Sequence, residues 1–97
     1  MTETAYDFVN SLAAQMLDYG RTVEFTENSG YISITCRGRV PREATIEASA
    51  VKMIATGEWA FRGVYVYQRY SDPIHLATRD DARDAINKYV TTEVDNG

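Results

Sequence analysis

The most constraining part of this chain is residues 59–70, whose sequence is Trp-Ala-Phe-Arg-Gly-Val-Tyr-Val-Tyr-Gln-Arg-Tyr. Side chains alternate across a β-strand, so this run predicts one long strand with apolar groups on both faces. One face would carry four aromatic residues: Trp59, Phe61, Tyr65 and Tyr67. The other would carry Ala60, Val64 and Val66. A small domain covers only one face of its sheet, so the second face needs a helix, a second copy of the chain or a partner.

Alternation groups these side chains but leaves open which group is buried. In one arrangement Val64 and Val66 face the helices, and the aromatic residues form an open face. In the reverse arrangement the aromatic residues are the core. Gly63 leaves a third arrangement, because a glycine inside a strand marks a bulge or bend that switches the faces partway along.

The length of 97 residues has room for one hydrophobic core but not for two. A hydrophobic content of 44% and a charged content of 25% are ordinary for a globular protein. We therefore expect a single domain over residues 1–97, with an ordered core over residues 4–90. The polar tail, residues 91–97, is expected to fray.

Three segments are predicted to be helical. Residues 5–17 carry apolar side chains at helical spacing, with Thr4 as a cap before them and Gly20 after them. Residues 79–90 follow the same spacing after Thr78. Residues 43–56 are rich in alanine and lie between a proline and a glycine, which favours a third helix.

The remaining segments alternate in the manner of strands. Residues 22–27 and 31–37 are joined by Asn-Ser-Gly, which predicts a hairpin with a three-residue loop. Residues 74–77 form a short strand after the 59–70 strand and a turn. The predicted fold is α+β, a four-stranded, mostly antiparallel sheet with three helices on one face, in the order α-β-β-α-β-β-α.

No motif in the sequence points to catalysis, a metal or a cofactor. One histidine, His75, and one cysteine, Cys36, are too few for a zinc site, and phosphate-binding glycine loops are missing. Cys36 alternates with isoleucines and is expected to be buried. We predict a non-enzymatic protein with no catalytic residues and no cofactor. The alternative is a small enzyme that uses His75 with Asp72 or Cys36.

The net charge of −4 argues against general binding to a nucleic-acid backbone. The acidic residues gather in the two terminal predicted helices, whereas the arginines lie in the strand-rich middle. The chain starts without a signal-peptide pattern and has no apolar stretch of about 18 residues. We therefore expect a cytoplasmic protein that does not contact a membrane.

Two surfaces are candidates for function. Tyrosine, tryptophan and arginine are enriched at the centres of protein interfaces. The candidate partner-binding residues are Tyr31, Arg37, Arg39, Trp59, Phe61, Tyr65, Tyr67 and Arg69. An acidic helical surface is the second candidate, because carboxylates can imitate phosphates and occupy a basic groove. Its members are Asp7, Asp18, Asp80, Asp81 and Asp84. An ordinary solvated surface is the alternative for this second set.

The leading hypothesis is a protein-binding module whose size and acidity suit an inhibitor or regulator of a nucleic-acid-handling protein. Phage-borne antagonists of host defence share this size and charge, although no motif ties the chain to such a family. The partner would then carry a basic surface, or it would be a second copy of the chain in a homodimer. The alternative is single-stranded nucleic-acid binding, with aromatic rings stacking on bases and arginines contacting phosphates.

Overall fold

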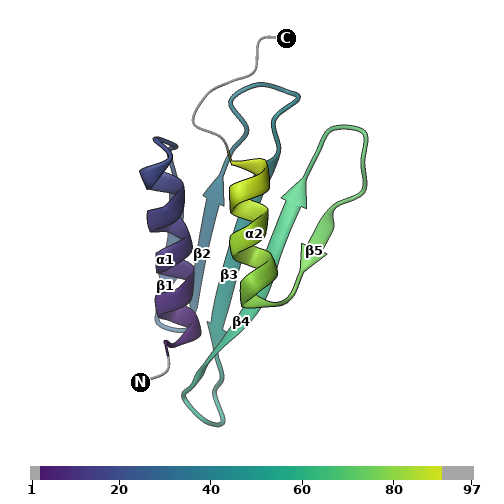
Figure 1. Cartoon of the computed structure of the whole chain (residues 1–97). Coiled ribbons are helices and arrows are strands. Elements are labelled where there is room, and N and C mark those ends of the chain that lie inside the picture. Colours follow the sequence, from purple (N-terminus) through teal and green to yellow (C-terminus); the bar gives the residue numbers. More distant parts are fainter. Residues whose placement is uncertain (1–2, 91–97) are drawn as a thin grey trace.

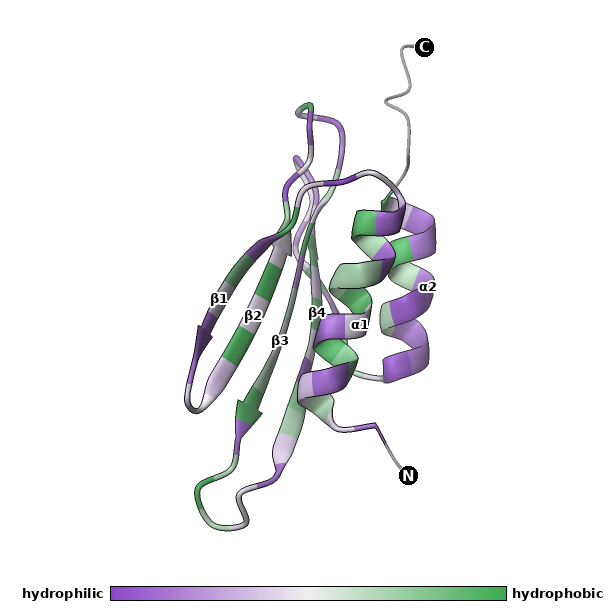
Figure 2. Cartoon of the chain, turned by 90° about the vertical axis from the view of Figure 1, so that its left-hand side faces the viewer, coloured by the Kyte–Doolittle hydropathy of each residue, from purple (hydrophilic) through white to green (hydrophobic). Residues whose placement is uncertain are grey.

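The computed structural model, which describes residues 3–90, has two layers: a five-stranded antiparallel sheet and two helices on one of its faces (Figures 1 and 2). In chain order its elements are α1 (Ala5–Asp18), β1 (Glu24–Asn28), β2 (Tyr31–Cys36), β3 (Thr45–Lys52), β4 (Trp59–Tyr67), β5 (Ile74–Leu76) and α2 (Arg79–Tyr89). The α+β class is confirmed. The four-stranded sheet with three helices, in the order α-β-β-α-β-β-α, is wrong, because the order is α-β-β-β-β-β-α. The predicted frayed tail, residues 91–97, lies outside the described residues.

The error in the fold lies in residues 43–56, which form strand β3 rather than a helix. Its buried side chains alternate with period two, at Ile46, Ala48 and Ala50. β-branched residues such as Thr45 and Val51 favour the strand. The alanines that suggested a helix have another role, because their small side chains let α1 pack closely on the centre of the sheet. Antiparallel pairing with β2 and β4 on both sides supplies the backbone hydrogen bonds.

The other predicted elements are confirmed. The side chain of Thr4 accepts a hydrogen bond from the Asp7 amide at 3.1 Å, and Thr78 caps α2 in the same way through the Asp81 amide. The β1–β2 hairpin has a shorter loop than expected, because Asn28 pairs with Tyr31 and leaves only two residues between them. No helix within residues 3–90 is long and apolar enough to cross a membrane.

The core lies between the helices and the inner face of the sheet. The helices contribute Phe8, Val9, Leu12, Ala13, Met16, Ala82, Ala85 and Ile86, and the strands contribute Ile32, Ile34, Cys36, Ile46, Ala48, Ala50, Val64 and Val66. The predicted burial of Cys36 is confirmed, and this burial raises the pKa of its thiol. Thiolate chemistry is therefore disfavoured at this residue.

A β-bulge in β4 decides which aromatic side chains enter the core. Ser49 of β3 pairs with Gly63, but the next residue, Ala50, pairs with Phe61, so one residue of β4 is left over. The extra residue reverses the alternation. Trp59 and Phe61 therefore turn toward α1, where Phe61 makes an edge-to-face contact with Phe8 at 5.0 Å between ring centroids. The prediction that all four aromatic residues share a face is wrong, and the switch at Gly63 is confirmed.

The bulge is closed by His75 of β5. Its Nε2 lies 3.0 Å from the carbonyl oxygen of Arg62, and because a carbonyl only accepts, Nε2 carries the proton in this contact. The imidazole lies across Gly63, where an added Cβ would stand 2.4 Å from Nε2 and 2.8 Å from the carbonyl oxygen of Leu76. Gly63 also has a φ of +97°, which residues with a side chain rarely adopt.

We therefore expect Gly63→Ala to lower the free energy of unfolding by about 2 kcal/mol, through the contact with the β5 backbone and the strained φ. Urea unfolding followed by circular dichroism measures this change. Gly30→Ala is the matched control, because an added Cβ at Gly30 meets nothing within 4 Å. Equal stability of the two variants would contradict this account of the bulge.

Candidate interaction surface

The outer face of the sheet is covered by neither helix (Figure 2). A row of rings lies on it: Tyr65 stacks on Tyr67 with 6.1 Å between ring centroids, and on His75 with 4.5 Å. Tyr65 and His75 are paired across β4 and β5, which brings the two rings together. The two tyrosines are 36% and 40% exposed. The row therefore offers ring surface to a binding partner.

Carboxylates border this row. Glu47 of β3 lies directly opposite Tyr65, and Glu24 of β1 lies two strands farther along the same register, beyond Thr35 of β2. Partial burial raises the pKa of the Tyr67 hydroxyl, and the charge of Glu47 raises it further. The centre of the face is thus aromatic and weakly acidic rather than basic.

Tyr31 lies on the same face but toward the opposite end of the sheet, opposite Val51 of β3. Ser33, which is buried, and Ser49 lie between Tyr31 and the ring row. Of the four predicted aromatic residues of β4, only Tyr65 and Tyr67 reach this face, because the bulge turns Trp59 and Phe61 inward. The structure therefore brings together half of the predicted aromatic set.

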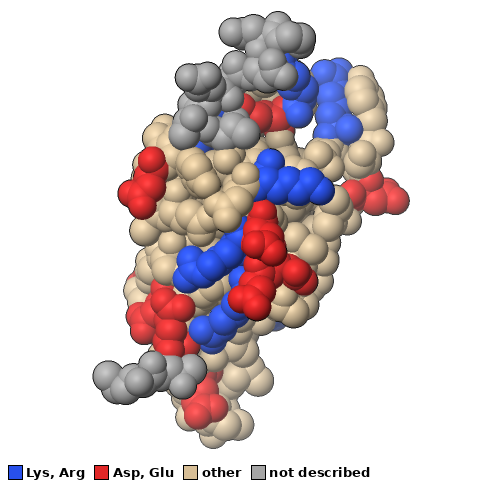
Figure 3. All heavy atoms as spheres, in the orientation of Figure 1, with Lys and Arg blue, Asp and Glu red and all other residues tan. Residues whose placement is uncertain are grey.

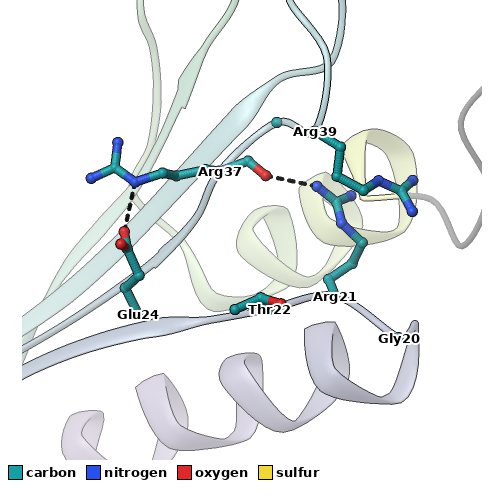
Figure 4. Close-up of a pocket in the computed structure, with 7 residues that line it drawn as sticks. Gly20, Arg21, Thr22, Glu24, Arg37 and Arg39 are labelled. Atoms are coloured by element: carbon teal, nitrogen blue, oxygen red, sulfur yellow. Dashed lines mark hydrogen bonds and ion pairs between the residues drawn. The ribbon is translucent and has the colours of Figure 1, made fainter.

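Arginines gather at one end of the molecule, the upper end in Figure 1. Three connections meet there: residues 19–23, 37–44 and 68–73. We call this region the arginine end. It carries Arg21, Arg37, Arg39, Arg42 and Arg69. Two of the three connections line a hollow of about 320 Å³, between Arg21 and Arg37 (Figure 4).

Three of these arginines already form ion pairs with two glutamates. Glu43 holds Arg21 at 2.8 Å and Arg39 at 3.0 Å, while Arg37 binds Glu24 at 2.7 Å and points away from the other two (Figure 4). The side chain of Arg21 is only 2% exposed and also donates to the carbonyl oxygen of Arg37. Hydrogen bonds from Arg39 lower the pKa of Glu43 below its usual value, even though burial opposes this shift. This network joins the connections to one another.

The ring row and the arginine end form one surface. Tyr67 lines a hollow of about 400 Å³ together with Arg39 and Arg69, so the aromatic row continues into the connections. We call Tyr65, Tyr67, Arg39 and Arg69 the Tyr–Arg surface. All four are among the predicted partner-binding residues.

The predicted acidic residues lie on the two helices, but the charge there is mixed. Asp7 and Asp18 lie on α1, and Asp80, Asp81 and Asp84 lie on α2. Blue and red groups are intermixed over the helical layer (Figure 3). Arg79 and Arg83 approach Glu3 at 3.9 Å and lie over the ring of Phe8. Basic side chains are therefore interspersed with the carboxylates that would imitate phosphates.

The structure separates His75 and Cys36, one of the two pairs considered for an enzyme. His75 lies on the outer face of the sheet, whereas Cys36 is buried on the inner face. Within residues 3–90, no group of three or more histidine, cysteine, aspartate or glutamate side chains could hold a metal ion.

Comparison of the chain with protein-family models, with curated proteins and with solved structures found no match. The argument for function therefore rests on the geometry of this chain.

Two residues of this region, His75 and Arg42, are not among the partner-binding residues predicted from the sequence. His75 was considered only as a catalytic group, because its stacking on Tyr65 depends on the pairing of β5 with β4. Arg42 directly precedes the segment predicted to be a helix, residues 43–56, and no pattern in the sequence separates it from the paired arginines. The proline at position 41 and the neighbouring Arg39 and Glu43 are the local signals of a loop there.

Replacing Glu43 with glutamine removes the carboxylate that pairs with the buried guanidinium of Arg21. We expect Glu43→Gln to lower the free energy of unfolding by about 3 kcal/mol near neutral pH. Because the folded-state pKa of Glu43 is lowered, its stabilisation is present above the unfolded value of about 4.3 and is lost as the pH falls through the folded value. Urea unfolding at about pH 7 and about pH 3 should show the difference between variant and wild type shrinking in acid.

Glu24→Gln is the matched control, since the Arg37–Glu24 pair is 71% and 55% exposed. Its effect should stay below about 1 kcal/mol. An equal loss of stability in both variants, or a loss in Glu43→Gln that persists in acid, would refute the role given to Glu43.

Proposed function

We propose that this chain is a non-enzymatic protein-binding module that contacts its partner through the Tyr–Arg surface. The observation that carries the proposal is the ring row, formed by Tyr65, Tyr67 and His75 on the uncovered face of the sheet. Tyr65 and Tyr67 are exposed there, on the side of the sheet opposite the core. Their continuity with Arg39 and Arg69 supports a single contact area rather than scattered exposed groups.

The chemistry of these side chains suits an interface. A tyrosine offers a large ring at little cost in conformational entropy, and its hydroxyl can bond at the rim. Stacking of Tyr65 between Tyr67 and His75 restricts the ring before any partner arrives. A contact area that is ordered in advance loses less entropy on binding.

Charge favours a protein partner over single-stranded nucleic acid. Stacking of bases on Tyr65 would bring phosphates close to Glu47, and the chain as a whole carries −4. Arg37 and Arg39 are bound to carboxylates of this chain, so phosphates would have to compete for them. The same sheet face therefore supports nucleic-acid binding less well than protein binding.

The more specific predictions about the partner and the location are not tested by the fold. An inhibitor or regulator of a nucleic-acid-handling protein, and a cytoplasmic location, remain predictions on which the fold has no bearing. A homodimer through the sheet face is one form of the proposed function, with a second copy of the chain as the partner. The mixed charge of the helical layer gives the acidic surface no added support.

The proposal predicts that a photo-cross-linking amino acid at position 67 captures a protein, whereas the same group at Ala14, an exposed position on α1, does not. With the captured protein purified, Tyr65→Ala and Tyr67→Ala should each weaken binding by about 2 kcal/mol, or roughly 30-fold in Kd. Isothermal titration calorimetry measures this change. Light scattering shows whether the captured protein is a second copy.

Phe25→Ala is the matched control, because Phe25 is an exposed aromatic residue on β1 with 51% of its surface accessible. It pairs with Ile34 and so belongs to the helical side of the sheet. Binding that depends on Phe25 but not on the two tyrosines would refute the proposal. So would tight binding of single-stranded oligonucleotides that is lost in the tyrosine variants.

A further inference from the structure

Arg42 and Arg69 differ from the other arginines of the arginine end. Within residues 3–90, neither forms an ion pair, whereas Arg21, Arg37 and Arg39 all bind glutamates. Both are exposed and line the same hollow of about 480 Å³. This hollow lies between the 37–44 and 68–73 connections.

The hollow is built from restrained backbone. A turn closed by the Glu43 amide and the Val40 carbonyl oxygen, at 3.0 Å, holds one wall, and a turn closed by the Ser71 amide and the Gln68 carbonyl oxygen holds the other. The Arg69 guanidinium lies 4.8 Å from the centroid of the Tyr70 ring. This stacking restricts the guanidinium while leaving its N–H groups unpaired.

Tyr70 itself has an unusual conformation. Its φ of +65° is in the left-handed region, where an aromatic residue costs about 1 kcal/mol or more. Its side chain is 91% exposed, so no burial within the chain offsets this cost. A strained, fully exposed ring beside an unpaired arginine is the arrangement that a bound partner would stabilise.

The charge of the arginine end indicates the charge that a bound segment would carry. Five arginines are opposed by four acidic residues, Asp18, Glu24, Glu43 and Asp72, and none of the four pairs with Arg42 or Arg69. The end is therefore positive in a chain that is negative overall. The planar fork of an arginine matches a carboxylate with two parallel hydrogen bonds.

We propose that Arg42 and Arg69 bind an acidic segment of the protein partner, with its carboxylates on the two guanidinium groups and its backbone against Tyr70. This inference rests on the proposed function and adds the chemistry of the partner. It differs from the expectation of a basic partner, which was based on the acidic helical surface. Arg69 lines both this hollow and the one beside Tyr67, so the acidic segment would continue from the ring row.

A nucleic-acid backbone fits the hollow less well. Tight binding to a phosphate backbone needs many cationic contacts, and only two unpaired arginines are available here. Asp72 lies in the 68–73 connection and would repel a continuous row of phosphates. A peptide can place two carboxylates on the arginines and keep uncharged groups near the acids.

The test uses a fluorescently labelled glutamate-rich peptide of about eight residues, long enough to span the hollow. Fluorescence anisotropy at about 20 mM and about 200 mM salt should show binding that weakens as salt rises. The double variant Arg42→Ala/Arg69→Ala should weaken binding at least about tenfold at low salt. Arg62→Ala is the matched control, because Arg62 is also exposed and forms no ion pair within residues 3–90, but lies in the β4 bulge.

Equal binding by the double variant and by Arg62→Ala would overturn the inference, and so would tighter binding of a single-stranded oligonucleotide than of the peptide. Phe25→Ala, which removes an exposed aromatic side chain on the helical side of the sheet, should leave peptide binding unchanged. If a captured partner depends on the tyrosines but not on Arg42 and Arg69, the inference fails while the proposed function stands. If the peptide binds through the arginines and no partner depends on the tyrosines, the proposed function fails instead.

Discussion

The β-bulge at Gly63 is the constraint on which the two faces of this sheet depend. Without the extra residue, strict alternation would put Trp59 and Phe61 on the same side as Tyr65 and Tyr67. The helical layer would then lose the contact between Phe8 and Phe61, or the sheet would bury its tyrosines and expose its valines. With the bulge in place, the start of β4 supplies aromatic residues to the core beneath α1. The end of β4 supplies valines to the core and tyrosines to the open face.

His75 links the core to the outer face through this same bulge. Its Nε2 donates to the carbonyl oxygen that the bulge withdraws from the ladder, and the other side of its ring stacks on Tyr65. One side chain therefore satisfies a backbone group and orders the ring row. The short strand β5, three residues long, contributes to both faces: its inner residues Ile74 and Leu76 pack against the core, and His75 faces outward between them.

Periodicity and capping residues were sufficient to predict α1, α2 and the β1–β2 hairpin, because each is specified within its own segment. Strand β3 was missed because its inner side chains are alanines, which score as helix formers, although the position beneath α1 requires small groups. For the site, the sequence indicated Tyr65, Tyr67, Arg39 and Arg69. It could not exclude Trp59 and Phe61, since the direction of a face after a bulge depends on tertiary packing rather than on spacing.

The abundance of arginine in the sequence gives no measure of how many arginines are available for binding. Arg21 and Arg39 share Glu43, and the Arg21–Glu43 pair holds two connections, residues 19–23 and 37–44, together at one end of the sheet. Arg37 is exposed, yet Glu24 of the neighbouring strand already binds it. Pairing of this kind arises only when segments distant in sequence meet, so a count of charges cannot separate structural arginines from free ones. Among residues 3–90, Arg42 and Arg69 form no ion pair, and we propose that this local positive charge, rather than the overall −4, selects the partner.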